Sequence, residues 1–347
     1  MNAGNFAARL RSREQLIGYW VVLDAPVATE RIARIGYDYV VLDGQHGLLG
    51  YQGLLTNLMA IDAGSSLRTP ARAGAGASAD ASARADSDAD ASARADADAS
   101  ARADADASTG TGAGTGAGVG SDARAGTVGL VRVEANNPTP IGRALDAGAA
   151  GVIVPLVDTA ADAARAVAAA RYPSPRNTNA AADSSGTGTP AAADASGGST
   201  AAAGMGGGVR SYGPMRSGLR IGPVPAEADV ATVVLAMIET PQGLANVAEI
   251  CATPGLDGIY VGPSDLCLSV GGRYPGDPEV ADEFNAAIEL IAKTARAAGV
   301  AAGIHTPDGE TAQRYLAAGY TYATVSSDLT HLEEIATTHL ETARSAG

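Results

Sequence analysis

Short runs of apolar residues alternate along this chain with longer segments in which apolar residues recur every third or fourth position. The runs have the length and β-branched content of strands buried in a parallel sheet, and the recurring spacing predicts helices with one apolar face. We predict eight strands, at residues 17–23, 37–42, 128–133, 151–155, 233–239, 258–262, 301–305 and 321–326. Helices are predicted between them and after the last, at residues 25–35, 54–63, 138–147, 160–170, 242–251, 279–298, 309–318 and 329–344.

Two stretches interrupt this alternation because they contain almost nothing that a core could bury. Residues 65–126 repeat the sequence Ser-Ala-Arg-Ala-Asp and then become rich in glycine. Residues 177–208 consist mainly of Ala, Ser, Thr and Gly, with Met205 as the one large apolar residue. We expect both to be disordered low-complexity insertions. Without them the chain has about 250 residues, the usual size of an eight-stranded βα barrel.

The pattern therefore predicts an α/β fold, a (β/α)₈ TIM barrel, in which residues 1–347 form a single domain with two insertions. Barrels of this kind carry their active sites at the C-terminal ends of the strands. Six polar residues fall at or just after those ends: Asp43, His46, Arg132, Glu239, Asp265 and His305.

Glu239 and Asp265 stand at the ends of two neighbouring strands, which makes them candidate metal ligands. Two carboxylates that leave room for water and substrate are suited to a divalent cation such as Mg²⁺ or Mn²⁺. Each acid also has a simpler interpretation. Glu239 could cap the helix that begins near Pro241, and Asp265 could be an ordinary loop acid.

Charge and composition exclude several other functions. The net charge of −14, without a cluster of Lys and Arg, argues against nucleic-acid and anionic membrane partners. No apolar run approaches the roughly 18 residues of a membrane span, and the first residues lack the apolar core of a signal peptide. Cys251 and Cys267 form no disulfide or metal-binding pattern. We expect a cytoplasmic protein that acts on small molecules.

Several segments, taken together, resemble the HpcH/HpaI aldolase and citrate-lyase β-like family. The resemblance covers the whole chain except the two insertions. It is carried by Gly36 to Gly47, Val131-Arg132-Val133, Asn137-Pro138, Leu145-Asp146-Ala147-Gly148, Val154-Pro155, Arg171-Tyr172-Pro173, Ile238-Glu239-Thr240 and Gly262-Pro263-Ser264-Asp265-Leu266. It implies a barrel of the phosphoenolpyruvate/pyruvate type and a class II, metal-dependent pyruvate aldolase.

The resemblance also implies roles for individual residues. Glu239 and Asp265 would hold a divalent ion, Mg²⁺ or Mn²⁺ or else Co²⁺, and no organic cofactor is expected. The catalytic base would be His46. The remaining roles go to Asp43 and Asp146 as partners of the histidine in a proton relay, Arg132 on the oxygen of the pyruvate enolate, and Ser264 and Gln45 as further substrate contacts.

Physical chemistry agrees with these roles, although other interpretations stay open. An imidazole is a base near neutral pH, and a cation stabilises the negative charge that forms as a 2-oxo acid is cleaved. His46 could instead be a surface histidine, and Arg132 could form a structural ion pair with Asp146. His305 could be structural or face the substrate. Many family aldolases carry Glu where this chain has Gln45, and some carry Gln where it has Met237. The identity of the substrate is therefore left open.

The favoured function is reversible cleavage of a 4-hydroxy-2-oxo acid, or of a 2-keto-3-deoxy sugar acid, to pyruvate and an aldehyde. Two alternatives are a lyase acting on malyl-CoA or citryl-CoA and a non-catalytic barrel that serves as an assembly or binding module. A CoA site needs a basic groove, and only Arg210, Arg216 and Arg220 lie close together in the sequence.

The resemblance further implies a homo-oligomer, a hexamer whose barrels exchange their last helix. The predicted helix at 329–344 carries Leu332, Ile335, Ala336 and Leu340 on one stripe. The sequence does not decide whether this stripe is covered by its own barrel or by a neighbour.

Overall fold

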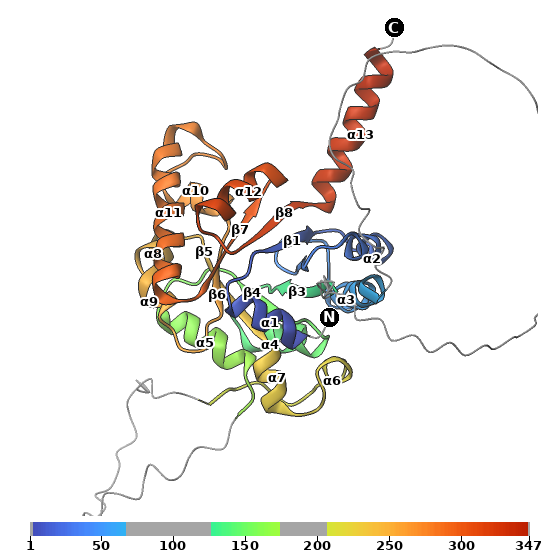
Figure 1. Cartoon of the computed structure of the whole chain (residues 1–347), viewed down its shortest axis with the longest axis vertical. Helices are drawn as coiled ribbons and strands as arrows, with labels where there is room; N and C mark the ends of the chain where they lie inside the picture. Colours follow the sequence, from blue (N-terminus) through green and yellow to red (C-terminus); the bar gives the residue numbers. More distant parts are fainter. Residues whose placement is uncertain (1–2, 67–125, 174–206, 346–347) are drawn as a thin grey trace, which may run out of the picture. The chain divides into compact units, whose positions relative to one another are not determined.

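The predicted barrel is present. The structure, a computed structural model, describes residues 3–66, 126–173 and 207–345. In it, eight parallel strands close into a barrel in sequence order (Figure 1). They are β1 (Leu16–Val21), β2 (Tyr39–Asp43), β3 (Val128–Arg132), β4 (Gly151–Val154), β5 (Val233–Ile238), β6 (Gly258–Val261), β7 (Ala301–Thr306) and β8 (Tyr322–Ser327). All eight predicted strands are confirmed, with ends that differ by at most two residues.

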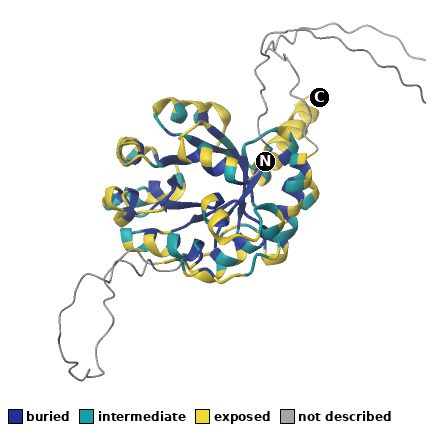
Figure 2. Cartoon of the chain, turned by 60° about the horizontal axis from the view of Figure 1, so that its bottom comes forward, coloured by how far each residue is buried: buried dark blue, intermediate teal, exposed yellow. Residues whose placement is uncertain are grey.

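Helices surround the barrel and expose their outer faces (Figure 2). They are α1 (Ala3–Arg11), α2 (Pro26–Ile35), α3 (Tyr51–Ser66), α4 (Pro138–Asp146), α5 (Ala160–Ala170), α6 (Ser217–Arg220), α7 (Pro225–Ala231), α8 (Pro241–Ala245), α9 (Val247–Cys251), α10 (Pro263–Ser269), α11 (Ala281–Ala298), α12 (Gly309–Ala318) and α13 (Asp328–Ser345), with a 3₁₀ turn, η2 (Pro278–Val280). The helix predicted at 242–251 is two helices that meet at Asn246, and α1, α6, α7 and α10 were not predicted.

The core has two parts because side chains alternate along each strand. On β2, Tyr39 and Val41 point into the barrel, whereas Val40 and Leu42 pack against the surrounding helices. Large tyrosines fill the interior, and glycines make room for them: a Cβ at Gly18 would lie 2.2 Å from the ring of Tyr39. The barrel is therefore packed through its middle, and ligands can enter only at its ends.

Helix α1 closes the N-terminal end of the barrel. Its apolar face buries Phe6 and Leu10, and the Phe6 ring lies 5.8 Å from that of Tyr39 inside the barrel. On its other side, the Nε of Arg11 donates a 2.6 Å hydrogen bond to Asp257, and Arg9 pairs with Asp38. This leaves the C-terminal end as the open one.

The two predicted insertions fall almost entirely on residues 67–125 and 174–206, which lie outside the described residues. Their expected disorder stays a prediction. At the first boundary the prediction began too early, since Ser65 and Ser66 are the last residues of α3.

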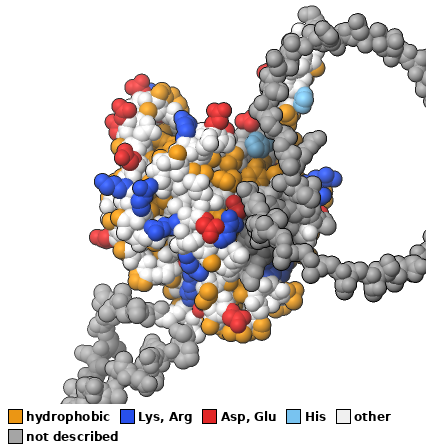
Figure 3. All heavy atoms as spheres, viewed as in Figure 1, with side chains coloured by type: hydrophobic (Ala, Val, Ile, Leu, Met, Phe, Trp, Pro, Cys, Tyr) orange, Lys and Arg blue, Asp and Glu red, His pale blue; other side chains and the backbone are white. Residues whose placement is uncertain are grey.

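Helix α13 leaves the barrel instead of packing along it (Figure 1). None of its described residues is buried, and Leu332, Ile335 and Leu340 are each at least half exposed. Its start is anchored: Asp328 accepts hydrogen bonds from the backbone of Val22 and Leu23. Apolar side chains gather on the surface beside this start (Figure 3). Within the part of the chain that the structure describes, no helix is long and apolar enough to cross a membrane.

Candidate active site

A cavity of about 200 Å³ opens at the C-terminal end of the barrel, where the sequence placed the chemistry. We call it the catalytic cavity. Its walls come from most of the strand ends, and they include four of the predicted site residues. The lining residues are Trp20, His46, Arg132, Met237, Tyr260, Gly262, Pro263, Ser264, Asp265 and His305.

Arg132 and Asp43 form a buried ion pair beneath this cavity. The Nε of Arg132 donates to Oδ1 of Asp43 at 2.9 Å, and its Nη2 donates to Oδ2 at 2.6 Å. The indole of Trp20 donates to the same carboxylate at 3.2 Å. Burial alone would raise the pKa of Asp43, but the hydrogen bonds and charge of Arg132 outweigh it, and this pKa is lowered. Asp43 is thus a carboxylate that fixes the guanidinium.

The pair leaves part of Arg132 available to a ligand. The guanidinium carbon lies 4.9 Å from the centre of the Trp20 ring, which holds one face of the group. Its Nη1 donates no hydrogen bond to the described residues, and Arg132 lines the catalytic cavity. Arg132 thus does form an ion pair at the barrel end, but with Asp43, whereas Asp146 pairs with Arg210. A buried, oriented donor that faces a cavity is suited to bind an anionic oxygen.

Asp43 also shapes the loop that carries His46. Its Oδ1 accepts from the backbone N–H groups of Gln45 and His46, at 3.0 and 3.1 Å. The turn is tight, since a Cβ at Gly47 would lie 2.3 Å from the carbonyl oxygen of Asp43. The expected link between Asp43 and His46 therefore runs through the backbone of the histidine. The imidazole itself is exposed at the rim of the cavity.

Glu239 follows β5 and is almost completely buried, with 3% of its surface exposed. Its Oε1 accepts a 2.8 Å hydrogen bond from the backbone of Leu156. Its Oε2 lies beside Gly262, where a Cβ would approach to 2.9 Å, so the glycine leaves room for the carboxylate. Thr240 caps α8 by accepting from Gly243, which removes the interpretation of Glu239 as a helix cap.

Asp265 lies in the first turn of α10 and lines the cavity, so it is not a loop acid. Burial raises the pKa of Glu239 most, the hydrogen bond from Leu156 opposes this, and the negative charge of Asp265 raises the pKa further. Asp265 lines the cavity, and Glu239 is buried beside Gly262, itself a wall residue; two carboxylates that repel each other in this way fit a divalent cation, which would relieve the repulsion. The described residues contain no group of three or more His, Cys, Asp or Glu placed to hold a metal, so water and substrate would complete its shell.

The structure does not bring Asp146 into this group. It is the last residue of α4, just before β4 begins, and so it lies at the opposite end of the barrel. There its Oδ1 accepts a 2.8 Å hydrogen bond from Arg210. Gln45 is half-buried in the His46 loop, where its Oε1 is buried and accepts no hydrogen bond from the described residues. Its contact with substrate stays a prediction.

Three ring side chains of the cavity were assigned no catalytic role from the sequence: Trp20, Tyr260 and His305, the last of which was left as either structural or substrate-facing. The His305 ring meets Trp20 edge to face at 5.5 Å between centres. Burial, helped by the charge of Arg132 and opposed by that of Asp43, lowers the pKa of His305 to about 4. In the structure Trp20 is the residue before the last of β1, close to the strand end where other site residues lie, but the predicted strand at 17–23 put it in the middle of the run.

Comparisons with known proteins agree with this geometry. Residues 120–334 match the HpcH/HpaI aldolase/citrate lyase family. A hydroxypyruvate/pyruvate aldolase of Rhizorhabdus wittichii is 29% identical over 318 residues, which cover 91% of this chain and 89% of the relative. A 5-keto-4-deoxy-D-glucarate aldolase of Klebsiella pneumoniae is 28% identical over 328 residues, covering 93% of this chain and 90% of the relative. A solved structure of a family protein from Burkholderia cenocepacia is 27% identical and superimposes with a TM-score of 0.64 over 98% of this chain and 99% of that one.

Proposed function

The chain belongs to the HpcH/HpaI aldolase/citrate lyase family, and on that basis we propose that it is a class II, metal-dependent aldolase. It reversibly cleaves a 4-hydroxy-2-oxo acid, or a 2-keto-3-deoxy sugar acid, to pyruvate and an aldehyde. The observation that carries this proposal is the buried Arg132, held by Asp43, at a cavity that also receives Asp265 and His46.

Each residue has a defined task in the reaction. Arg132 donates from Nη1 to an oxygen of the 2-oxo acid, where negative charge develops. Asp43 fixes the guanidinium so that no reorganisation is needed. His46 accepts the proton of the 4-hydroxyl as the C3–C4 bond breaks, and the electrons of that bond pass to C3 and the 2-oxo group. A proton then returns to C3 to give pyruvate. Ser264 and Gln45 contact the substrate.

Glu239 and Asp265 would hold the divalent ion, Mg²⁺, Mn²⁺ or Co²⁺. Use of such an ion is implied by the family. When bound, the ion supplies positive charge beside the carboxylate and keto oxygens of the substrate. Support comes from the buried carboxylate of Glu239, whose Oε2 faces the glycine at position 262.

Cleavage of a CoA thioester is less well supported. The cluster of Arg210, Arg216 and Arg220 is engaged elsewhere, because Arg216 and Arg220 pair with Asp62 and Arg210 pairs with Asp146. These groups lie near the N-terminal end of the barrel, away from the catalytic cavity. A CoA phosphate would find no basic groove there that opens onto the reacting atoms.

We also propose that the enzyme is a cytoplasmic homo-oligomer, a hexamer in which α13 packs on a neighbouring barrel. The half-exposed stripe of Leu332, Ile335 and Leu340 supports this, since an apolar stripe of this kind is usually covered. The free thiols of Cys251 and Cys267 are both buried, in keeping with a reducing compartment.

Release of pyruvate tests the function directly. The purified protein is given a panel of 4-hydroxy-2-oxo acids, 2-keto-3-deoxy sugar acids and malyl-CoA, with Mg²⁺ or Mn²⁺ present. We expect pyruvate from the first two classes, and neither acetyl-CoA nor glyoxylate, the products of malyl-CoA cleavage, from malyl-CoA. Cleavage of malyl-CoA alone would favour the thioester lyase, and no cleavage of any compound would favour a non-catalytic barrel.

A further inference from the structure

A second, larger cavity adjoins the catalytic one. We call it the side cavity; its volume is about 570 Å³, and it lies between α10, η2, α11, the start of α12 and the start of α13. The two cavities share Pro263, Ser264 and His305 as walls. Small-molecule sites usually enclose about 300–1,000 Å³, a size that the catalytic cavity alone does not reach. The side cavity provides the missing space next to the reacting atoms.

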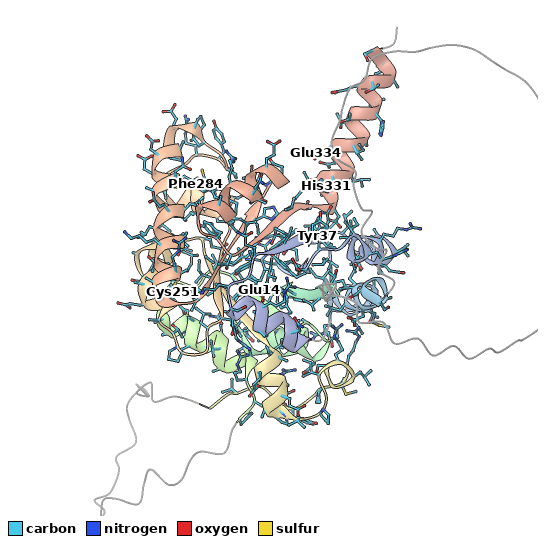
Figure 4. All side chains as sticks on the ribbon, viewed as in Figure 1. Glu14, Tyr37, Cys251, Phe284, His331 and Glu334 are labelled. Carbon is cyan, nitrogen blue, oxygen red and sulfur yellow. The ribbon has the colours of Figure 1, made fainter. Side chains whose placement is uncertain are left out.

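Most of the side-cavity wall is apolar. Phe284 reaches it from α11 (Figure 4), and prolines and an alanine surround it. The partly or fully buried polar groups in this part of the wall already have partners, whereas Asn285 and Arg314, which also line it, are exposed to solvent. Asp277 is held by Arg273, and Thr311 both receives a hydrogen bond from Arg314 and donates its backbone N–H to Asp308. An anionic substituent would therefore meet only the exposed, solvent-screened Arg314 here, whereas an apolar one would be sheltered from water.

Two polar atoms of the wall are exceptions. Nδ1 of His305 and Oγ of Ser326 are buried and make no hydrogen bond with the described residues. Buried polar atoms are nearly always hydrogen-bonded, so two unpartnered ones on residues that line the same cavity are candidate partners for a ligand there. They come from neighbouring strands, because β7 and β8 pair with His305 opposite Thr324.

The backbone at Ser326 is unusual as well. Ser326 is 2% exposed and has a φ of 51°, in the left-handed region that a serine seldom occupies. It lies where the pairing of β8 with β1 shifts by one residue, since Tyr19 faces Val325 but Trp20 faces Ser327. Such a bulge redirects a side chain, and strained backbone is concentrated at functional sites.

We propose that the aldehyde half of the substrate occupies the side cavity. There His305 and Ser326 select an uncharged aldehyde that has an apolar body and one hydrogen-bonding oxygen in addition to its carbonyl oxygen. This inference rests on the proposed function. His305 is neutral at physiological pH, because its pKa is lowered to about 4 by burial and by Arg132. It can therefore donate or accept one hydrogen bond without attracting an anion, and its ring is held in place by Trp20.

The test uses the reverse reaction, in which pyruvate adds to an aldehyde. The probes are acetaldehyde, glycolaldehyde, cyclohexanecarboxaldehyde and succinic semialdehyde, and kcat/KM is measured for each. We expect cyclohexanecarboxaldehyde to exceed both acetaldehyde and succinic semialdehyde by about 10-fold or more, since several buried CH₂ groups contribute. Glycolaldehyde should exceed acetaldehyde because it offers a second oxygen. A preference for succinic semialdehyde would overturn the inference.

Two variants locate the selectivity. Ala281→Trp fills the side cavity from α11, and we expect it to raise KM for cyclohexanecarboxaldehyde about 10-fold, with a much smaller effect on acetaldehyde. Ala286→Trp is the matched control, an exposed alanine on the same helix that lines neither cavity. His305→Phe keeps the ring but removes its nitrogens, so the advantage of glycolaldehyde over acetaldehyde should disappear. Wild-type selectivity in both Ala281→Trp and His305→Phe would also overturn the inference.

Exchange of the methyl protons of pyruvate in D₂O separates this inference from the proposed function. The exchange reports on the catalytic cavity alone and needs no aldehyde. If wild-type protein shows neither exchange nor addition, the proposed function fails and the inference fails with it. If exchange and addition occur but the selectivity differs from the one described, only the inference fails.

Discussion

The carboxylate of Asp43 accepts five hydrogen bonds, and this concentration of partners explains how one residue organises the site. Two come from Arg132, one from Trp20 and two from the backbone of Gln45 and His46. The same carboxylate thus orients the group that binds the substrate oxygen and positions the loop of the base. Its own chemistry is unused, so we regard Asp43 as a positioning residue.

Replacement of Arg132 tests the role of the ion pair. Lysine keeps the charge but cannot donate to Asp43 through two nitrogens and still bind a ligand with a third. We expect Arg132→Lys to lower kcat by about 10²-fold or more, the usual effect of losing a fixed donor to developing charge. Arg143→Lys is the control, because Arg143 is an exposed residue of α4 that lies outside the catalytic cavity. Turnover near wild type in Arg132→Lys would refute the assignment.

His305 makes the stability of the protein depend on pH. Its pKa of about 4 in the folded state lies below the ordinary value of 6.5, so the unfolded chain binds more protons between these values. The stabilisation is complete above pH 6.5 and is lost as the pH falls toward 4. We expect the free energy of unfolding of the wild type to fall by on the order of 2 kcal/mol more than that of His305→Phe across this interval.

Urea unfolding at pH 7.5, 6, 5 and 4.5 measures this difference. The wild type and His305→Phe are compared at each pH, so that acid effects common to both proteins cancel. Parallel pH profiles for the two proteins would mean that His305 does not titrate with a lowered pKa.

Among the elements, the strands were predicted well because each is a short, continuous run of buried apolar residues that is visible in the local sequence. Helix α10 was missed because its seven residues are too few for a helical pattern to stand out. Pro263 at its first position was the available signal, since proline is favoured there. The predicted helix at 242–251 broke at Asn246, whose side chain donates to the carbonyl of Asp158, a contact no local pattern reveals.

The site residues were likewise predicted where strand position decides them and missed where packing between distant segments does. The strand-end rule correctly gathered Arg132, Asp265 and His46, because parallel strands bring their C-terminal ends together. Asp146 came from the family resemblance, although its place at the end of a predicted helix already put it at the opposite end of the barrel. The side cavity could not be predicted, since it depends on how α11, α12 and the turn at 275–278 pack against one another.

Helix α1 was also missed, yet it covers the N-terminal end of the barrel, and its contribution can be measured. Phe6 is fully buried against Tyr39. We expect Phe6→Ala to lower the free energy of unfolding by about 3–5 kcal/mol, the usual cost of removing a buried ring. Activity of the folded fraction should be unchanged, because the catalytic cavity lies at the other end. Chemical unfolding measures the free energy, and a kinetic assay measures the activity. A decrease in the free energy of unfolding of less than about 1 kcal/mol would mean that α1 does not seal the barrel.

At the scale of the whole molecule, α13 determines whether the barrel acts alone. The double variant Leu332→Glu with Ile335→Glu places two charges on the apolar stripe, which should dissociate the proposed hexamer because a buried unpaired charge is costly. Thr337→Glu lies on the face of the same helix that points away from Leu332 and Ile335, and is the control. Light scattering gives the mass of each. A monomeric wild type at micromolar concentration with full activity would contradict the exchange of α13.

The central claim is that Glu239 and Asp265 hold a divalent ion that the cleavage requires. The decisive measurement is pyruvate release from a cleaved 4-hydroxy-2-oxo acid, before and after chelation and after return of Mn²⁺, alongside calorimetric binding of Mn²⁺. Glu239→Gln is compared with Glu249→Gln, an exposed acid of α9. We predict that chelator abolishes release, that Mn²⁺ restores it, and that Glu239→Gln alone loses both binding and release. Full release in excess chelator, or in Glu239→Gln, would contradict the account.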